Sequence, residues 1–309
     1  MQKAKINHIA CDKQSHHGGY SIDTEKCQVL LKIIESGSFS KAAEQLGYTP
    51  SGINRMVKSM EEETGFPLFS RTSQGVTLTS EGQRLLPIFQ ELTHWQKQLQ
   101  ELCTDIRGLS IGHLTIGTYY STAACWLPKI IQAFQANWPG IQIDLWEGGN
   151  SDLVQRLESH QLDCCFFSEY HGQGDWIPLQ QDELVAWLPK DHPLAKGRSF
   201  PLEALNGAPF IQPLPEQNTD LERLLTSHQL TPQIRFTTSD NYTAYSMVAA
   251  GLGISLNNAL MAQNWTGPVV TLPFDPPQHI TLGIALPSLA QASPALKKFI
   301  ACAQRVLSS

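Results

Sequence analysis

The stretch from Phe39 to Lys58, FSKAAEQLGYTPSGINRMVK, constrains the fold of this 309-residue chain more than any other. We expect Ser40 to cap a short helix, which Gly47 is suited to end because glycine readily adopts positive φ. Thr49 and Pro50 then start a second helix, as its N-cap and its first residue. Two short helices joined by a tight turn predict a helix-turn-helix. The alternative is an ordinary helical hairpin within a core.

The second helix of this pair has an apolar side and a polar side. Ile53, Val57 and Met60 recur at helical spacing, so we expect them to be buried. The polar side chains between them can form hydrogen bonds with phosphates or with base edges in a major groove. The pattern therefore favours a recognition helix that binds DNA.

A β-wing is expected directly after this helix. Phe66–Phe69 and Val76–Leu78 are typical of two short extended pieces around a polar turn at 70–75. Arg71 in that turn is suited to a phosphate or to the minor groove; the alternative is an arginine that faces solvent. The residues expected to contact DNA are Ser40, Thr49, Ser51, Asn54, Arg55, Lys58 and Arg71.

The residues from Ile22 to Leu86 closely resemble the DNA-binding domain of LysR-type transcriptional regulators, through GSFSKAAEQLGYTPSGINRMVKSMEEETGFPLFSRTSQGVTLTSEGQRLL. Weaker matches at LTIG, LPKIIQAFQANWPGIQI and DELVAWLPKDHPLA extend the resemblance over nearly everything after Ser21. The resemblance implies an N-terminal winged helix-turn-helix, a long coiled-coil linker helix and a C-terminal, periplasmic-binding-protein-like effector domain with two α/β lobes. It also implies a homodimer or homotetramer that binds double-stranded promoter or operator DNA and a small-molecule effector.

A long helix is expected from about Ser80 to Arg107, with Thr79 as its cap. Its large apolar residues repeat in an a/d pattern over three heptads, which is typical of a coiled coil. We interpret this helix as a dimerisation linker; the alternative is that its apolar face packs against the body of its own chain. The residues expected to form the dimer seam are Leu85, Ile88, Leu92, Trp95, Leu99 and Leu102.

Beyond a hinge-like break at 108–112, expected strands alternate with expected helices, the first of them near Thr122–Trp138, a pattern that favours parallel βαβ units. The first lobe is expected to comprise 112–182 and 281–309, and the second lobe 183–280. The chain would then consist of a disordered extension (1–20), a winged helix-turn-helix domain (21–79), a dimerisation helix (80–107) and an effector-binding domain (108–309).

Ligands of open α/β sheets bind beyond the carboxyl ends of the strands, often at helix N-termini. Ser121 and Thr122 follow the first strand of the effector domain, where their hydroxyls would suit a carboxylate or another anion. Plain N-capping by these two hydroxyls is the alternative. The residues expected to bind the effector are Thr118, Tyr120, Ser121, Thr122, Gly149, Ser168, Thr238 and Ser239.

Composition and cysteine spacing limit the classes of function that the chain can have. The net charge is −6, so affinity for DNA must come from a few well-placed cations and from dimerisation. The seven cysteines show no C-x-x-C or metal-ligand spacing, which favours a reduced, cytoplasmic protein without a metal or cofactor. Cys164-Cys165 could be a redox pair, but such residues more often fill a buried strand. No apolar run reaches the roughly 18 residues of a membrane span.

An enzyme is not expected. Ser38–Lys41 fits S-x-x-K and Ser239–Asn241 fits S-D-N, two signatures of serine β-lactamases, but the chain has no K-T-G. It also contains no Walker loop and no H-E-x-x-H. The sequence therefore predicts a ligand-responsive, sequence-specific transcriptional regulator. The alternative is a solute-binding module with a vestigial DNA-binding domain, which would bind a ligand without protecting an operator.

Overall fold

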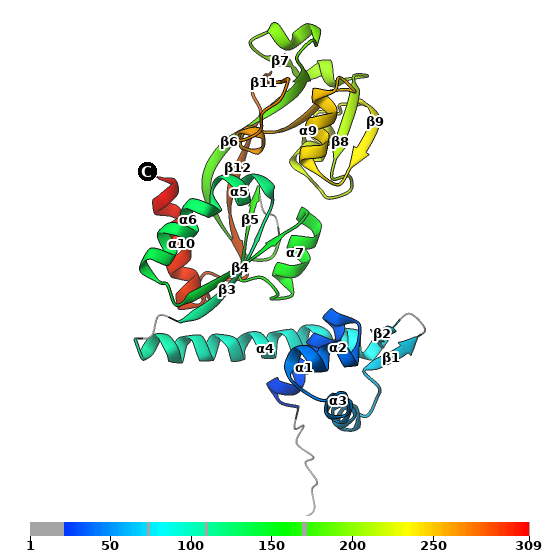
Figure 1. Cartoon of the computed structure of the whole chain (residues 1–309), viewed down its shortest axis with the longest axis vertical. Coiled ribbons are helices and arrows are strands. Elements are labelled where there is room, and N and C mark those ends of the chain that lie inside the picture. Colours follow the sequence, from blue (N-terminus) through cyan, green and yellow to red (C-terminus); the bar gives the residue numbers. More distant parts are fainter. Residues whose placement is uncertain (1–21, 73–74, 109–110, 169–171, 309) are drawn as a thin grey trace, which may run out of the picture. The chain divides into compact units, whose positions relative to one another are not determined.

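The structure is a computed structural model that describes residues 22–72, 75–108, 111–168 and 172–308 (Figure 1). The extension expected at 1–20 lies outside the described residues. The chain divides into two compact units, Met1–Thr93 and His94–Ser309, which are taken separately below.

Three helices build the core of the first unit: α1 (Thr24–Ser36), α2 (Phe39–Leu46) and α3 (Pro50–Thr64). α2 ends at Gly47 with a φ of 72°, and Thr49 caps α3, as the sequence predicts. The expectation that Ser40 caps α2 is wrong. Ser38 has extended backbone and its hydroxyl accepts from the Lys41 N–H, because the helix starts early enough for Phe39 to pack against the core.

The wing is a single antiparallel pair, β1 (Phe69–Thr72) with β2 (Gly75–Leu78). Arg71 lies within β1 and opposite Val76, so the expectation of a turn over 70–75 is wrong. Strand pairing starts later than expected because the Glu61 carboxylate holds the beginning of the wing: it accepts from the Leu68 and Phe69 N–H groups at 2.7 and 3.3 Å.

One long helix, α4 (Ser80–Ile106), follows the wing. The Thr79 hydroxyl accepts from the Gly82 N–H at 3.0 Å, which confirms Thr79 as the residue that caps this end. In the first unit, Phe89 is buried and Leu85 is partly buried against the same core as Met60. The first turns of α4 therefore belong to the helix-turn-helix core.

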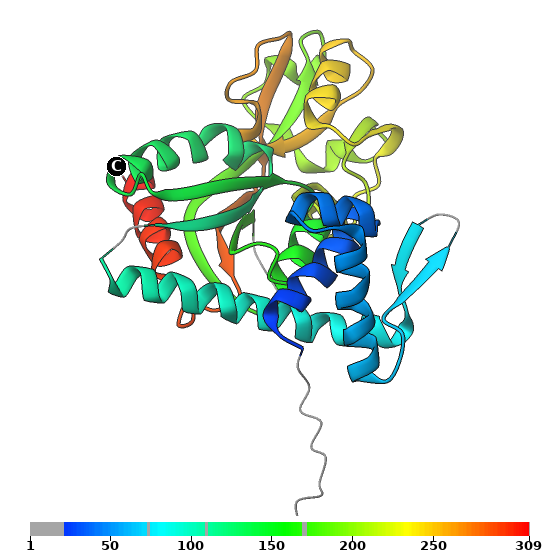
Figure 2. The same cartoon turned by 60° about the horizontal axis from the view of Figure 1, so that its bottom comes forward.

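The second unit, His94–Ser309, is called the effector unit below, after the role expected from the sequence. It is built on an eight-stranded sheet. Seven strands follow the order β4-β3-β5-β12-β6-β11-β7, and β10 also pairs with β6. In the first lobe of the effector unit, α6 (Leu127–Asn137) and α10 (Pro294–Leu307) cover one face, and α7 (Asn150–Glu158) covers the other (Figures 1 and 2). The strands of this lobe are β3 (Gly112–Thr118), β4 (Ile141–Glu147), β5 (Cys164–Ser168) and parts of β6 (Asp175–Pro189) and β12 (His279–Leu286).

The expected helix over 122–138 is wrong, because two helices stand in its place. α5 (Tyr120–Cys125) ends before Trp126, and α6 begins at Leu127. Pro128 explains the break, because a proline lacks the N–H that a continuous helix needs and its ring clashes with the preceding turn.

The second lobe contains the parallel pair β8 (Pro209–Pro213) and β9 (Gln233–Thr238), with α8 (Asp220–Ser227) and α9 (Asn241–Ala249). β10 (Ser255–Asn258), β11 (Val269–Asp275) and the short β7 (Phe200–Pro201) complete its strands; β11 and β7 were not expected from the sequence. β6 pairs with β12 up to Glu183 and with β10 from Leu184 onward. The two crossovers between the lobes therefore lie side by side, with Ile280 opposite Asp182.

Candidate functional site

The outer face of α3 displays cationic side chains above a closely packed core. Arg55 and Lys58 are exposed, whereas Ile53, Val57 and Met60 are buried, as their spacing predicts. The Lys58 ammonium lies 3.6 Å from the exposed Glu62 carboxylate. Exposed pairs of this kind are weak, so Lys58 can exchange this partner for a phosphate at little cost.

The start of α3 carries neutral polar groups on the same helix. The Thr49 hydroxyl accepts from the Gly52 N–H at 3.1 Å and lies 3.2 Å from the hydroxyl of exposed Ser51. The Asn54 amide donates to the Pro50 carbonyl at 2.8 Å. Of the other residues expected at DNA, Ser40 is exposed on α2 and Arg71 lies in β1.

The apolar stripe of α4 is largely uncovered. Leu85 joins the helix-turn-helix core, but the other five seam residues expose 41 to 57 % of their surface: Ile88, Leu92, Trp95, Leu99 and Leu102. Within the effector unit, α4 is held by ion pairs from other positions. The Lys97 ammonium lies 2.9 Å from the Asp163 carboxylate, and the Asp105 carboxylate lies 2.6 Å from the Lys298 ammonium. These ion pairs leave Ile88, Leu92, Leu99 and Leu102 exposed.

A small cavity lies between the two lobes of the effector unit. Its volume is about 50 Å³, which is room for only a few water molecules. Binding sites for metabolites are usually several times larger, so a ligand would have to move the lobes or their side chains. The polar residues of its wall include Tyr119 and Asn150 of the first lobe and Asp220, Asn241, Asn257 and Asn258 of the second.

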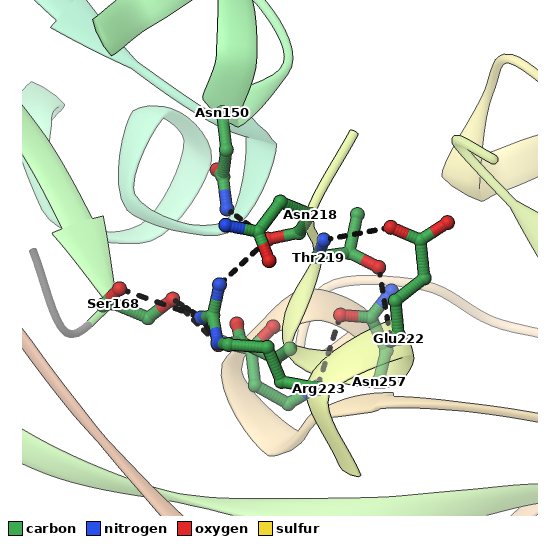
Figure 3. Close-up of polar contacts among 9 residues, drawn as sticks. Asn150, Ser168, Asn218, Thr219, Glu222, Arg223 and Asn257 are labelled. Atoms are coloured by element: carbon green, nitrogen blue, oxygen red, sulfur yellow. Dashed lines mark hydrogen bonds and ion pairs between the residues drawn. The ribbon is translucent and has the colours of Figure 1, made fainter. Parts of the chain in front are cut away.

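A polar clasp, formed by Asn150, Ser168, Asn218, Asp220 and Arg223, joins the lobes beside this cavity. Figure 3 labels all of these residues except Asp220. The Ser168 hydroxyl donates to the Asp220 carboxylate at 2.6 Å and accepts from the Arg223 guanidinium at 2.9 Å. The guanidinium also forms an ion pair with Asp220. The Asn218 carbonyl accepts from both Asn150, at 3.0 Å, and Arg223, at 2.6 Å.

The loop that carries Asn218 has an unusual backbone. Leu214, Glu216 and Asn218 have φ values of 48°, 63° and 50°, a region that costs a residue other than glycine roughly 1–2 kcal/mol. The Glu222 carboxylate holds the loop, because it accepts from the Glu216 N–H at 2.7 Å and from the Thr219 N–H at 3.2 Å. Figure 3 shows the contact with Thr219. The strained loop is therefore fixed where it can contact a ligand.

Three hydroxyls expected to bind the effector lie behind the cavity wall. Thr118, Ser121 and Thr122 are fully buried, and the Thr118 and Thr122 hydroxyls bond each other at 2.7 Å. The Ser121 hydroxyl accepts from the Asn258 amide at 3.3 Å. Neither Ser121 nor Thr122 caps α5, whose N-cap residue is Tyr119, so the alternative of plain N-capping is wrong.

The remaining expected effector residues are spread around the cavity. Gly149 lines it, and Ser168 belongs to the clasp. Thr238 and Ser239 line a more open groove of about 470 Å³, to which Gly149 also contributes. The Tyr120 hydroxyl accepts from the Trp265 indole at 2.7 Å, within an aromatic cluster.

Sequence reasoning missed Asp220 and Arg223 as site residues, and Tyr119, which follows the first strand of the effector domain, also lines the cavity. The Tyr119 hydroxyl is buried and has no hydrogen-bond partner among the described residues. Burial raises the pKa of Tyr119 well above its ordinary value, and the Asp220 and Asp182 carboxylates add to this rise, whereas the Ser121 side chain and the Arg223 guanidinium oppose it. The available signal was position: Tyr119 directly follows a strand, and Asp220 begins a helix of the second lobe.

The two adjacent cysteines are both buried within a strand. Cys164 and Cys165 are fully buried free thiols whose side chains join different apolar clusters, on opposite faces of β5. Burial raises the pKa of both thiols above the ordinary range. The expectation that they fill a buried strand is confirmed.

Two further findings concern only the residues that the structure describes. In those ranges, no group of three or more His, Cys, Asp and Glu side chains could hold a metal ion. None of the described helices combines the length and the apolar character needed to cross a membrane.

Family models account for both units. Residues 24–83 match the bacterial regulatory helix-turn-helix protein model of the lysR family, and residues 107–308 match the LysR substrate binding domain. This chain belongs to the LysR family of transcriptional regulators. It is accordingly a ligand-responsive, DNA-binding regulator, and the fold expected from the sequence is confirmed.

Relatives and solved structures agree with this LysR-family assignment. The chain is 29% identical over 252 residues to the HTH-type transcriptional activator CmpR of Synechocystis, covering 79% of this chain and 82% of CmpR. A full-length OxyR variant from Pseudomonas aeruginosa superimposes with a TM-score of 0.73 at 21% identity, over 93% of this chain and 94% of OxyR. Full-length CbnR, in complex with its target DNA, gives 0.64 at 16% identity, over 92% and 100%. These structures share the fold.

Proposed function

We propose that this LysR-family regulator reads an operator with the outer face of α3 and that a small molecule between the effector lobes changes how the operator is bound. The observation that carries the proposal is the placement of Arg55 and Lys58, both exposed on a helix whose opposite side is fully packed. A helix of this kind enters the major groove in helix-turn-helix proteins. The other residues proposed to contact DNA are Ser40, Thr49, Ser51, Asn54 and Arg71.

We propose that the regulator acts as a homodimer or homotetramer through the stripe on α4. Five large apolar residues are exposed along that helix at heptad spacing, and a second copy of the same stripe would bury them. Each subunit offers few cations to the phosphates, so pairing two recognition helices would also raise affinity for DNA.

The functional division that we propose has an extension at 1–20, a DNA-binding domain at 21–79, the dimerisation helix at 80–107 and the effector domain at 108–309. The lobes of the effector domain would be 112–182 with 281–309, and 183–280. A regulator of operator DNA acts in the cytoplasm and need not be an enzyme, and the relatives are transcriptional regulators.

The proposed effector site combines the expected residues with those that the structure adds. Gly149 and Tyr119 would contact the ligand from the first lobe, and Ser168 would act through the clasp. Thr118, Tyr120, Ser121 and Thr122 would support the wall, because they lie buried or bonded behind it. Thr238 and Ser239 would contact the part of a larger ligand that extends into the outer groove.

An operator selected from random DNA would test the proposal. The full-length protein should enrich a paired sequence, and a footprint on that sequence should disappear for Arg55→Ala. The matched control is Arg305→Ala, which removes an exposed arginine from α10. If no sequence is enriched, or if Arg55→Ala leaves the footprint unchanged, the assignment of α3 to the major groove is wrong. A vestigial DNA-binding domain predicts that no sequence is enriched.

A further inference from the structure

The cavity between the lobes is lined without a cation. None of the lining residues in the described part of the chain is a lysine, an arginine or a histidine, whereas Asp220 contributes a carboxylate to the wall. The guanidinium beside it, on Arg223, is already committed to Asp220, to the Ser168 hydroxyl and to the Asn218 carbonyl. The positive charge of Arg223 therefore balances Asp220 and leaves none for a ligand.

The wall offers amide groups in place of charge. The Asn257 amide donates to the Asn241 side-chain oxygen at 3.0 Å, and both residues line the cavity. Asn258 donates to the Asp182 carboxylate at 2.7 Å, so a second negative charge lies directly behind the wall. Paired amides can exchange hydrogen bonds with either donors or acceptors of a neutral ligand.

The helix N-termini at the cavity do not supply the positive charge that an anionic ligand would need. α8 and α9 begin at the cavity, but the Thr219 and Asp240 side chains already accept from the amides of their first turns. α7 begins after Gly149 with no side-chain cap. One helix end supplies only about half an elementary charge, which does not match a full anionic charge next to Asp220.

The Tyr119 hydroxyl is the polar group that awaits a partner. Tyr119 lines the cavity, and its hydroxyl oxygen is buried and makes no hydrogen bond to any described residue. Burial and the nearby carboxylates Asp220 and Asp182 raise the pKa of Tyr119, so its hydroxyl stays protonated at neutral pH and can donate. A buried hydroxyl without a partner is costly, and a ligand atom that accepts from it would recover that cost.

We infer that this site selects a small ligand that carries hydroxyl or amide groups and no net negative charge, and that the Tyr119 hydroxyl donates a hydrogen bond to it. An anion would lose its hydration beside Asp220 without gaining a cation. This inference rests on the proposed function and changes one expectation from the sequence. That expectation, a carboxylate or another anion, relied on Ser121 and Thr122, whose hydroxyls are buried behind the wall.

A divided metabolite extract tests the class of ligand with the full-length protein. A bacterial extract is passed over an anion exchanger, and the thermal unfolding of the protein is recorded with the unretained pool and with the retained pool. The unretained pool should raise the Tm, and the retained pool should leave it unchanged. A rise with the retained pool alone would overturn the inference. If neither pool acts, the ligand-binding part of the proposed function fails as well, while an operator footprint would still stand.

Variants of the wall test the named residues. Tyr119→Phe should weaken binding of the active compound about tenfold, because one hydrogen bond is lost. The matched control is Tyr242→Phe, which removes an exposed hydroxyl outside the cavity wall and should bind normally. Asp220→Asn leaves Arg223 without its counter-charge, so this variant should respond to the retained pool. Two results together would contradict the inference. Tyr119→Phe would bind the active compound as tightly as the wild type, and Asp220→Asn, shown by circular dichroism to be folded, would still give no Tm shift with the retained pool.

Discussion

The outer face of α3 and the cavity between the lobes are both polar, but they differ in charge and in how the chain builds them. A single helix displays Arg55 and Lys58 outward, at spacings that the sequence shows directly. The cavity draws Tyr119, Asn150 and Asp220 from three helix starts that are far apart in the sequence, and no cation lines it in the described residues. The first surface suits a polyanion and the second a neutral molecule, a difference that the net charge of −6 conceals.

The largest expected effect comes from breaking the proposed dimer seam on α4, because operator binding requires two subunits whereas ligand binding by the effector domain does not. Leu99→Glu would place two carboxylates in the α4 seam of a dimer, where burying unpaired charges costs several kcal/mol. Dimerisation should weaken by a hundredfold or more, and operator binding should be lost, while the effector domain still binds its ligand. Sedimentation would measure this, with the exposed neighbour Gln100→Glu as the control. An unchanged oligomer would show that the stripe is not the interface.

The next effect is confined to the DNA-facing surface. Arg55→Ala should cost about 1–3 kcal/mol of operator binding if Arg55 reads a base, and should relax specificity at one position. Lys58→Ala should weaken all sequences alike and reduce the salt dependence by about one phosphate contact, because its ammonium is a point charge. Binding curves at several salt concentrations distinguish the two roles. Identical behaviour of the two variants would mean that both residues contact only the backbone.

The contrast between the two surfaces also explains what the sequence could predict. Thr49, Pro50 and Gly47 are local signals, because each acts on the turn in which it lies, and the α2–α3 turn formed as expected. The shift of the α2 cap from Ser40 to Ser38 was missed because two serines two residues apart compete, and the packing of Phe39 decides between them.

The cavity depends on contacts that no local pattern records. Ser168 and Asp220 are 52 residues apart, and their hydrogen bond exists only once both lobes have folded. Ser121 was expected to bind the effector because it follows a strand, and the structure confirms that position. Whether a hydroxyl there faces a ligand or a neighbour depends on Asn258, a residue of the other lobe. The alternation of strands and helices could be predicted, but the order of the strands, several helix starts and the direction of these side chains could not.

A smaller effect should come from the clasp. Ser168→Ala removes one donor to Asp220 but leaves the guanidinium of Arg223 in place, so the effector unit should lose about 1 kcal/mol of stability. Thermal unfolding should show a lower Tm, with DNA binding by α3 unchanged. Ser227→Ala is the control, because that hydroxyl bonds only within the end of its own helix. Equal Tm values for the two variants would mean that the clasp does not hold the lobes.

The smallest expected effect is a difference in reactivity between a thiol of the first unit, Cys27, and a thiol of the second, Cys103. Burial and the neighbouring Asp23 raise the pKa of Cys27 to about 11, whereas Cys103 on α4 is exposed. A thiol reagent at pH 8 should therefore modify Cys103 first and Cys27 slowly. Because the folded pKa of Cys27 exceeds the unfolded value of 9.0, the folded unit keeps the Cys27 proton between pH 9 and 11, where the unfolded chain loses it. The contribution of this proton to the free energy of unfolding is therefore lost as the pH rises through that window. Equal rates for Cys27 and Cys103 would contradict the packing of α1.

Footprinting of the selected operator, with and without the active metabolite pool, examines the DNA-binding surface and the cavity in one experiment. Wild type should protect the operator and change its pattern when the pool is added. Arg55→Ala should protect nothing under either condition, whereas Tyr119→Phe should protect the operator and require about ten times more of the pool to change the pattern. If Tyr119→Phe responds at the same concentration as the wild type, the cavity between the lobes is not where the ligand acts.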